Sequence, residues 1–470
     1  MLEQWRRLGW AAGRKPAETK EISVNELTQI GAEKKVFLFL QMHCSRFGPQ
    51  LRDALVEAGH TVHKVNFCVG DWLYWRRSGA YTFRKPLNSW SAFLDDFITT
   101  HGVTDIVYYA DNKPYHRIAA RVARRRNINA YCYEFGYLRP DWITLERGAM
   151  ATLSHFPDTL ARVEEISEQI EFDWPEGNYR YPFKAEAFNE VVYHLSTSFG
   201  RPLFPYFHHD RYYLPLHEYL SYIPKLFRVN SNNTRANKLI DAMTSSGQKY
   251  FVVPMQLQSD YQIRLHSPFD HLSEMLRMVM VSFREHAPND SNLVIKIHPL
   301  DNAIENWPRV ARKLAKGFGI SNRVQIIDGG DLNRLLYNAE GTIMVNSTVG
   351  IHAIQNKCPV KVLGSAIFDM EGLTFQGSLD EFWNNKTLPD EKAVQRFLRV
   401  LAKTIQVKGC FYTKEGREAA IPEFVRRLET GDVNAHGAFI SPPPRLDRAM
   451  ASGVAIPPDT GWVKDRPIDA

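Results

Sequence analysis

Residues 293–299 read LVIKIHP, and this stretch decides how the second half of the chain folds. It is an apolar run of strand length that stops at His298 and Pro299, as a buried strand does where it enters a loop. Residues 341–354, GTIMVNSTVGIHAI, repeat the pattern with a short apolar run, three polar residues and a predicted helix from Gly350. Buried strands that alternate with helices predict a parallel sheet covered by helices.

The polar residues at these two strand ends suit an anion. Asn346, Ser347 and Thr348 precede the predicted helix, whose N-terminal amides and dipole favour negative charge. His298 is expected to donate a hydrogen bond to a phosphate there, and Lys296 to add positive charge. Each motif alone is equally compatible with an ordinary strand end or helix cap. The two together predict a phosphate site.

The same alternation extends in both directions from this stretch. Upstream, QKYFVVPMQLQSD (248–260) contains a predicted strand at 250–254, and Gln256, Gln258 and Asp260 follow its carboxyl end. Downstream, RVQIID (323–328) and PVKVLG (359–364) are further predicted strands. The pattern predicts one α/β domain over residues 246–430.

The first half of the chain shows the same organisation. The expected strands are VFLFLQ (36–41), HTVHKVNF (60–67), TDIVYYA (104–110) and AYCYEFG (130–136), with amphipathic helices between them. They predict a doubly wound domain over residues 30–180, and ligands of such domains bind at the carboxyl ends of the strands. Two such domains around a central cleft resemble the GT-B-like, two-Rossmann arrangement of nucleotide-sugar glycosyltransferases.

The segment YEFGYLRPDWITLERG (133–148) is the most polar of these strand ends. A carboxylate at a strand end, such as Glu134, is a natural base or nucleophile. An ion pair between Glu134 and Arg139 across a turn explains the same residues without chemistry, and the sequence leaves both interpretations open. Asp141 lies in the same segment.

Two other regions break the alternation. Residues 181–245 form a connector that includes RPLFPYFHHDRYYLPLHEYLSYIPKLFR (201–228), rich in aromatic and basic residues. That composition is typical of a membrane-interface segment, although a connector packed on the core would also fit. Residues 431–470 are Pro-rich and without periodicity, which predicts a disordered tail.

Length and composition limit the number of domains and the kinds of partner that we expect. A chain of 470 residues is expected to form two domains, and a net charge of +6 is too small and dispersed to indicate nucleic acid. The five cysteines show no CxxC spacing, which predicts neither a zinc site nor a disulfide framework. The N-terminus lacks the apolar region of a secretory signal, and no run reaches the ~20 apolar residues of a membrane span. We expect a cytoplasmic protein with peripheral membrane contact at most. Neither a dinucleotide-binding nor a P-loop motif occurs.

Several motifs together resemble the bacterial capsule polysaccharide biosynthesis family, in its KpsS/LipB branch. They are YEFGYLRPDWITLE (133–146), VVPMQLQSDYQIRLHSPF (252–269), VIKIHPLD (294–301), NSTVGIHAI (346–354) and CPVKVLGSAIFDMEGLTFQGSLDEFW (358–383). The resemblance implies a retaining β-Kdo transferase that uses CMP-β-Kdo and starts a poly-Kdo linker on lyso-phosphatidylglycerol at the inner membrane. It implies no further cofactor and no metal, and other capsule assembly proteins are possible partners.

The resemblance also implies roles for residues. The HP pair at 298–299 is similar to that of CMP-sugar transferases such as bacterial sialyltransferases, in which the His contacts the CMP phosphate. A retaining reaction by double displacement needs a nucleophilic carboxylate and a base. Glu134 is the first candidate carboxylate, with Asp260 and Asp141 in reserve, because Phe135 stands where related transferases carry a second acid.

The expected substrate ligands are drawn from both predicted domains. Arginine and lysine side chains suit the carboxylate of Kdo, and polar side chains at strand ends suit the rest of the donor. The set is Lys296, Arg139, Arg264, Ser347, Thr348, Asn346, Gln256 and Gln258. A transferase for another CMP- or UDP-activated sugar, and a non-enzymatic capsule assembly or export factor, remain alternatives.

Overall fold

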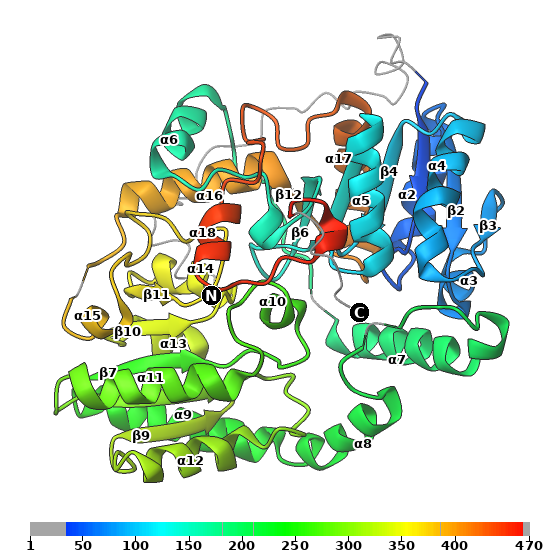
Figure 1. Cartoon of the computed structure of the whole chain (residues 1–470). Helices are drawn as coiled ribbons and strands as arrows, with labels where there is room; N and C mark the ends of the chain where they lie inside the picture. The colour runs from blue at the N-terminus through cyan, green and yellow to red at the C-terminus, as the bar shows by residue number, and fades with distance from the viewer. Residues whose placement is uncertain (1–33, 181, 210, 386, 464–470) are drawn as a thin grey trace. The chain divides into compact units, whose positions relative to one another are not determined.

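The computed structural model describes residues 34–463 except 181, 210 and 386. The start of the predicted first domain at residue 30, and the last residues of the predicted tail, lie outside the described residues. From Lys35 onward the chain forms one unit that contains two β-sheets, each flanked by helices (Figure 1). The predicted α/β class is therefore confirmed.

The first sheet has seven strands in the order β12-β6-β5-β4-β1-β2-β3. The strands are β1 (Val36–Phe39), β2 (Thr61–Asn66), β3 (Ala80–Thr82), β4 (Asp105–Tyr109), β5 (Asn129–Phe135), β6 (Trp142–Arg147) and β12 (Gln406–Lys408). All neighbours from β3 to β5 pair in parallel, whereas β6 is antiparallel to both β5 and β12. No strand was predicted at WITLER, which forms β6 because a hairpin turns the chain back on β5.

The second sheet has five strands in the order β11-β10-β7-β8-β9, all parallel. The strands are β7 (Tyr250–Pro254), β8 (Asn292–Ile297), β9 (Val324–Asp328), β10 (Gly341–Met344) and β11 (Val360–Val362). Every residue of β8 is buried, as a strand at the centre of a parallel sheet requires. The strands predicted from LVIKIHP outward are thus present.

Helices cover both faces of each sheet. They are α2 (Phe47–Glu57), α3 (Val69–Trp75), α4 (Trp90–His101), α5 (Pro114–Arg126), α6 (Leu160–Gln169), α7 (Phe183–Phe199), α8 (Pro215–Leu226), α9 (Val229–Ser245), α10 (Tyr261–Arg264), α11 (Leu272–His286), α12 (Trp307–Gly317), α13 (Leu332–Tyr337), α14 (Val349–Gln355), α15 (Leu379–Phe382), α16 (Glu391–Ile405), α17 (Lys414–Thr430) and α18 (Leu446–Ala451). Short 3-10 turns occur at Leu87–Ser89, Ala151–Leu153, Arg201–Leu203 and Pro458–Thr460.

Alternate side chains of the central strands enter different cores. In β1, Phe37 and Phe39 pack with α2 and α17, while Leu38 packs on the opposite face with α4 and α5. In β8, Val294 faces one core and Ile295 the other, where α11 and α12 pack. Successive side chains of a strand point to opposite faces of the sheet. Because helices cover both faces, every position of these central strands has to be apolar.

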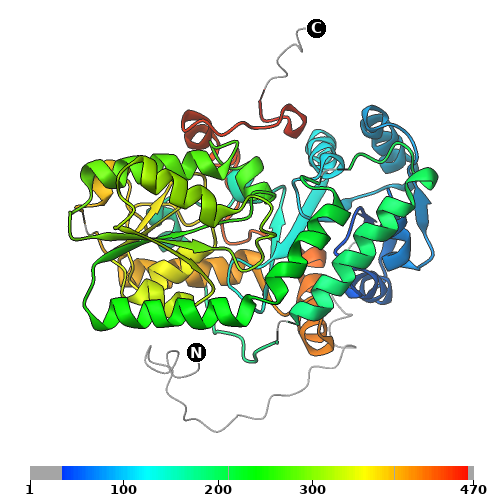
Figure 2. The same ribbon diagram turned by 90° about the horizontal axis from the view of Figure 1, so that it is seen from below.

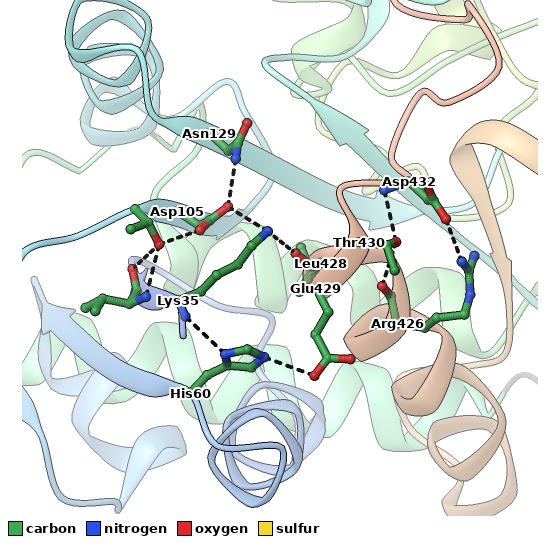
Figure 3. A network of polar contacts seen from close by, with 11 residues as sticks. Lys35, His60, Asp105, Asn129, Arg426, Leu428, Glu429, Thr430 and Asp432 are labelled. Atoms are coloured by element: carbon green, nitrogen blue, oxygen red, sulfur yellow. Dashed lines mark hydrogen bonds and ion pairs between the residues drawn. The ribbon is translucent and has the colours of Figure 1, made fainter. Parts of the chain in front are cut away.

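The end of the predicted second domain returns to the first sheet. Strand β12 pairs with β6, and α17 packs against α2. Figure 3 shows the contacts near the end of α17: the Lys35 ammonium donates to the Leu428 carbonyl over 2.7 Å, and His60 Nε2 lies 3.0 Å from Glu429 Oε1. Residues 406–430 therefore complete the first domain. A three-residue edge strand carries too little pattern to reveal this from the sequence.

The predicted connector at 181–245 is largely helical. Helix α7 packs against α3 of the first domain, and α9 packs beside β9 of the second. The buried residues of α9 are Ala236, Ile240 and Met243, a sparse helical pattern in a polar segment. The aromatic and basic stretch between α7 and α9 contains α8.

The expectation of a disordered tail is wrong for residues 431–463. This segment contains α18, and its Arg445 is completely buried. The Arg445 guanidinium donates to the carbonyl oxygen of Phe156 over 2.8 Å, and to those of Ser154, Pro157 and Ile367. Ser154 and Phe156 follow β6, whereas Ile367 follows β11. The hydrogen bonds of this buried guanidinium order a Pro-rich segment whose sequence has little apolar periodicity.

We expect Arg445→Met to destabilise the protein by about 3 kcal/mol or more, because it leaves buried carbonyl groups without donors. Thermal unfolding would show a lower Tm. Arg448→Met on the same helix is the matched control, since the Arg448 side chain is 44% exposed. Equal Tm values for the two variants would contradict the structural role of Arg445.

Candidate active site

Glu134 lies at the carboxyl end of β5, opposite Thr144 of β6. The pKa of its carboxyl group is raised to about 8, mainly by burial and in addition by the negative charges of Asp111 and Asp260. The positive charges of Arg139 and Lys113 oppose this rise. With this pKa, Glu134 holds a proton at neutral pH. Its carboxyl group has no hydrogen-bond partner among the described residues and is therefore available to a ligand.

Asp260 comes from the second domain, in the loop after β7. Its carboxylate caps α10 by accepting a hydrogen bond from the Gln262 N–H over 2.9 Å. Burial raises the pKa of Asp260, while the Gln262 N–H and the charge of Arg139 lower it. Two carboxyl groups from different domains are therefore close enough to interact, and they carry different hydrogen-bond environments. Such pairs commonly divide acid and base roles.

The positive charge of Arg139 acts on both carboxyl groups. Arg139 lies in the β5–β6 hairpin, and its guanidinium carbon is 5.1 Å from the centroid of the Phe135 ring. Its charge lowers the pKa values of Glu134, Asp260 and His298. The Phe135 ring thus supports the guanidinium. The predicted contact of Arg139 with a carboxylate of the substrate stays a prediction.

The tautomer of His298 follows from one hydrogen bond. The Leu300 N–H donates to His298 Nδ1 over 3.0 Å, so Nδ1 carries no proton. Burial lowers the pKa of His298 to about 4, helped by the charges of Lys225, Lys296 and Arg139, and the ring is neutral at pH 7. Its proton is then on Nε2, which has no partner within the described residues. His298 therefore presents a neutral N–H donor, and its predicted contact with a phosphate stays a prediction.

Lys296 is oriented differently from His298. Its ammonium donates to the carbonyl oxygen of Gly329, in the turn after β9. Burial lowers the pKa of Lys296, while the charges of Asp328 and Asp331 raise it. These contacts connect Lys296 to the β9–α13 turn, and its predicted contact with the donor stays a prediction.

The segment NSTVG forms the turn between β10 and α14. Ser347 Oγ accepts a hydrogen bond from the Val349 N–H over 3.2 Å, and both Ser347 and Thr348 are half-buried. His352 on α14 was not among the predicted site residues. Its pKa is lowered by burial and by the charge of Arg139, so it lies within electrostatic range of the hairpin arginine. A histidine in a helical apolar segment gives no sequence signal that separates it from a core residue.

Gln256 and Asn346 bond to each other rather than projecting freely. The Gln256 amide donates to Asn346 Oδ1 over 2.9 Å, and its oxygen accepts from the Asn346 backbone N–H over 3.2 Å. Asn346 Nδ2 also donates to the carbonyl oxygens of Gln262 and His266, over 2.8 and 3.0 Å. These two residues hold the segment that follows Asp260.

We expect Asn346→Ala to lower the free energy of unfolding by about 2–4 kcal/mol, since it leaves the Gln262 carbonyl and the Gln256 side-chain amide without these buried partners. Differential scanning calorimetry would measure the loss. Asn338→Ala removes an exposed side chain and serves as the control. A loss no larger than that of the control would show that the bonds of Asn346 do not support this segment.

The remaining predicted residues make identifiable contacts. Gln258 bonds to the Asp270 carbonyl and the Leu272 N–H at the start of α11. The Arg264 guanidinium lies over the rings of Tyr261 and Tyr212, at 5.2 and 5.7 Å from their centroids. Asp141 forms a 2.9 Å ion pair with Lys408 and joins the hairpin to β12. Their predicted roles in binding or catalysis stay predictions.

One contact that the sequence did not indicate joins the two domains beside the carboxylates. His266 Nε2 lies 2.8 Å from Asn112 Oδ1, and Asn112 directly follows Asp111 after β4. Burial lowers the pKa of His266 to about 4, so the ring is neutral and Nε2 donates to the Asn112 oxygen. This bond holds the loop of Asp260 against the strand end that carries Asp111.

Within the described part of the chain, no group of three or more His, Cys, Asp or Glu side chains is placed to hold a metal ion. Over the same residues, no helix is long and apolar enough to cross a membrane.

The two sheets, each with a core of parallel strands and with helices on both faces, form a GT-B-like α/β fold of two Rossmann-like domains. The sequence model for the capsule polysaccharide biosynthesis protein family matches residues 104–412. The chain belongs to this family.

Named relatives agree with this assignment. The capsule polysaccharide modification protein LipB of Neisseria meningitidis serogroup A is 31% identical over 405 residues, which cover 83% of this chain and 94% of LipB. The capsule polysaccharide export protein KpsS of Escherichia coli is 28% identical, over 83% of this chain and 99% of KpsS. A solved structure of Thermosulfurimonas dismutans KpsC, beta Kdo 2,7 transferase, aligns with a TM-score of 0.41 and 15% identity, over 84% of this chain and 100% of that chain.

Proposed function

We propose that this protein is a retaining β-Kdo transferase that moves Kdo from CMP-β-Kdo to lyso-phosphatidylglycerol and so starts the poly-Kdo linker of a capsular polysaccharide. The sugar and the acceptor come from the family resemblance. The observation that carries the proposal is the pair of carboxyl groups, Glu134 and Asp260, contributed by different domains with Arg139 acting on both.

The two carboxyl groups suit the two half-reactions of double displacement. Asp260 belongs to the domain of His298, and its capped, Arg139-stabilised carboxylate is the nucleophile in our assignment. One of its oxygens forms a bond to the anomeric carbon of Kdo, and the bond from that carbon to the phosphate oxygen breaks. The electron pair leaves with CMP, which needs no proton because a phosphate ester is a stable anion.

The second half-reaction uses Glu134 as the base. When Asp260 becomes an ester it loses its charge, and one of the two carboxylates that raise the pKa of Glu134 is removed. Glu134 then ionises more readily and accepts the proton of the acceptor hydroxyl. The hydroxyl oxygen bonds to the anomeric carbon, and the bond to Asp260 breaks to restore its carboxylate.

Donor binding uses the neutral N–H of His298 and the charge of Arg139. In our proposal His298 Nε2–H donates to the CMP phosphate and stabilises the charge that develops there, as a fixed donor does in an oxyanion site. Arg139 meets the carboxylate of Kdo, for which a guanidinium offers two parallel donors. Ser347, Thr348 and His352 follow β10, which is separated from β8 by β7 in the sheet, and we assign them to the same phosphate.

The test is incubation of the purified protein with CMP-Kdo, generated in situ, and a fluorescent lyso-phosphatidylglycerol, followed by mass spectrometry. A product heavier by one Kdo supports the donor, the acceptor and the reaction class together. A product with another CMP- or UDP-sugar would replace Kdo in the proposal. Binding of polysaccharide or lipid without turnover of any nucleotide sugar would instead indicate a non-enzymatic assembly or export factor. We place the reaction at the cytoplasmic face of the inner membrane.

A further inference from the structure

Helix α8 is amphipathic, but its apolar face is exposed and its polar face packs on the protein. Leu216, Leu220, Ile223 and Phe227 recur at intervals of four, three and four residues, which puts them on one helical face. Their exposed fractions are 66, 56, 48 and 85%. A surface helix normally turns such an apolar face to the core, so this face needs an apolar environment outside the described chain.

The polar face of α8 provides the contacts with the protein. Glu218 is buried and pairs with Arg211 over 2.7 Å. The Tyr222 hydroxyl donates to the Leu300 carbonyl over 2.7 Å, and the Lys225 ammonium donates to the carbonyls of His298 and Asp301 over 3.2 and 3.0 Å. The helix is therefore fixed in this orientation by the loop that carries His298.

The segment before α8 extends the apolar surface. Phe199, Leu203, Tyr206 and Leu214 are 81, 53, 56 and 78% exposed. Exposed apolar side chains of this size usually occur singly on soluble proteins, and their concentration in one segment marks an interaction surface. Helix α7, drawn in blue-green, lies beside the blue α3 of the first domain, and Figure 2 shows this side of the molecule from below.

The charges around the apolar face favour an anionic partner. Among the described residues from 199 to 229, the exposed Asp, Glu, Lys and Arg side chains are Arg201 and Arg228, and the exposed histidines are His208, His209 and His217. The acidic residue of α8, Glu218, is buried and paired. A helix that lies in the plane of an anionic bilayer inserts leucine and phenylalanine side chains among the acyl chains and keeps arginine at the level of the headgroups. A helix of 12 residues is too short to span a bilayer but long enough to lie in its interface.

We propose that α8 is an in-plane membrane-docking helix that inserts Leu216, Leu220, Ile223 and Phe227 into a bilayer containing anionic lipid. The inference deepens the proposed function, on which it rests for the lipid nature of the acceptor. Because Lys225 and Tyr222 bond to the 298–301 loop, docking places the phosphate-binding loop directly above the surface from which the acceptor comes. The membrane face and the donor site are thus two sides of one helix.

The experiment is cosedimentation of the full chain with vesicles of phosphatidylcholine alone or mixed with phosphatidylglycerol. The test variant is Leu216→Ser/Leu220→Ser/Phe227→Ser. The matched control is Met278→Ser/Tyr337→Ser/Leu388→Ser, which removes side chains that are 47, 68 and 63% exposed elsewhere. We expect the α8 variant to lose at least about tenfold in affinity for the mixed vesicles, and the control to bind like the unmodified protein.

Activity separates this inference from the proposed function. CMP release from CMP-Kdo in the absence of acceptor should be unchanged in the α8 variant, while transfer to lipid embedded in vesicles should fall with binding. Undiminished vesicle binding by the α8 variant would overturn the docking helix even if the protein is a Kdo transferase. Vesicle binding that depends on α8, in a protein that transfers no sugar, would support the helix and overturn the proposed function. A dimer that dissociates in the α8 variant, without vesicle binding by either protein, would assign the face to a second copy of the chain and overturn the inference.

Discussion

Glu134→Gln is expected to stop sugar transfer to the acceptor while allowing CMP to leave once per protein molecule. The base of the second half-reaction is lost, which lowers the transfer rate by about 10²–10⁴-fold. The first half-reaction needs only Asp260, so a covalent Kdo adduct should accumulate on that residue. Intact-protein mass spectrometry would detect the added mass, and peptide mapping would locate it.

The location of the adduct decides between the two carboxylates. Asp260→Asn should show neither adduct nor CMP release, although it should still bind CMP. Asp141→Asn is the control, because the ion pair with Lys408 gives that residue a structural contact at β12. An adduct on Glu134 in the unmodified protein would reverse the assignment, with Glu134 as the nucleophile. An adduct on Asp141 would refute both assignments.

The raised pKa of Glu134 also gives a stability prediction. Between pH 4.5, the ordinary value, and about 8, the folded state keeps a proton that the unfolded state has released. Stability from this group is therefore complete at acid pH and declines as the pH rises through this window. Glu134→Gln, which cannot ionise, should have a Tm equal to or above that of the unmodified protein at pH 8. A lower Tm would mean that the inactive variant is damaged in its fold.

His298→Ala is the second change with a large expected effect. It removes the Nε2–H donor that we assign to the CMP phosphate, and one such donor contributes about 10²–10³-fold to kcat. Single-turnover CMP release from the donor would report the loss without any contribution from the acceptor. His298→Gln, which can place an N–H near the same position, should recover part of the rate.

The control for His298 is a change at the same loop that keeps the imidazole. Lys225→Met removes the bonds to the carbonyls of His298 and Asp301 but leaves the ring intact. Its effect on CMP release should be smaller than that of His298→Ala. An equal loss in both variants would show that the loop conformation matters and that the imidazole itself does not contact the phosphate.

The strand ends were predictable from the sequence because each is a local pattern. LVIKIHP forms β8 and then the turn of His298, and AYCYEFG forms β5 with Glu134 at its carboxyl end. Parallel sheets bury both faces of their strands, so a short run of apolar residues followed by polar ones identifies the strand and its functional edge.

Contacts between distant segments could not be predicted in this way. Nothing local in YEFG or LQSD indicates that Glu134 and Asp260 come within electrostatic range of each other. His352 resembles any histidine on an apolar helix, and its proximity to Arg139 follows from the fold. The prediction that the Pro-rich tail is disordered was wrong because it too depended on distant contacts. The acceptors of Arg445 belong to loops of both domains.

The return of β12 and α17 to the first sheet also governs the order in which the chain can fold during synthesis. The second domain is continuous in the sequence from α9 to α15, so all its strands are available once that segment has left the ribosome. The first sheet must wait for its outermost strand and for the helix that covers α2. The early-synthesised half is thus the last to close, and until then its edge strand β6 is exposed to other chains.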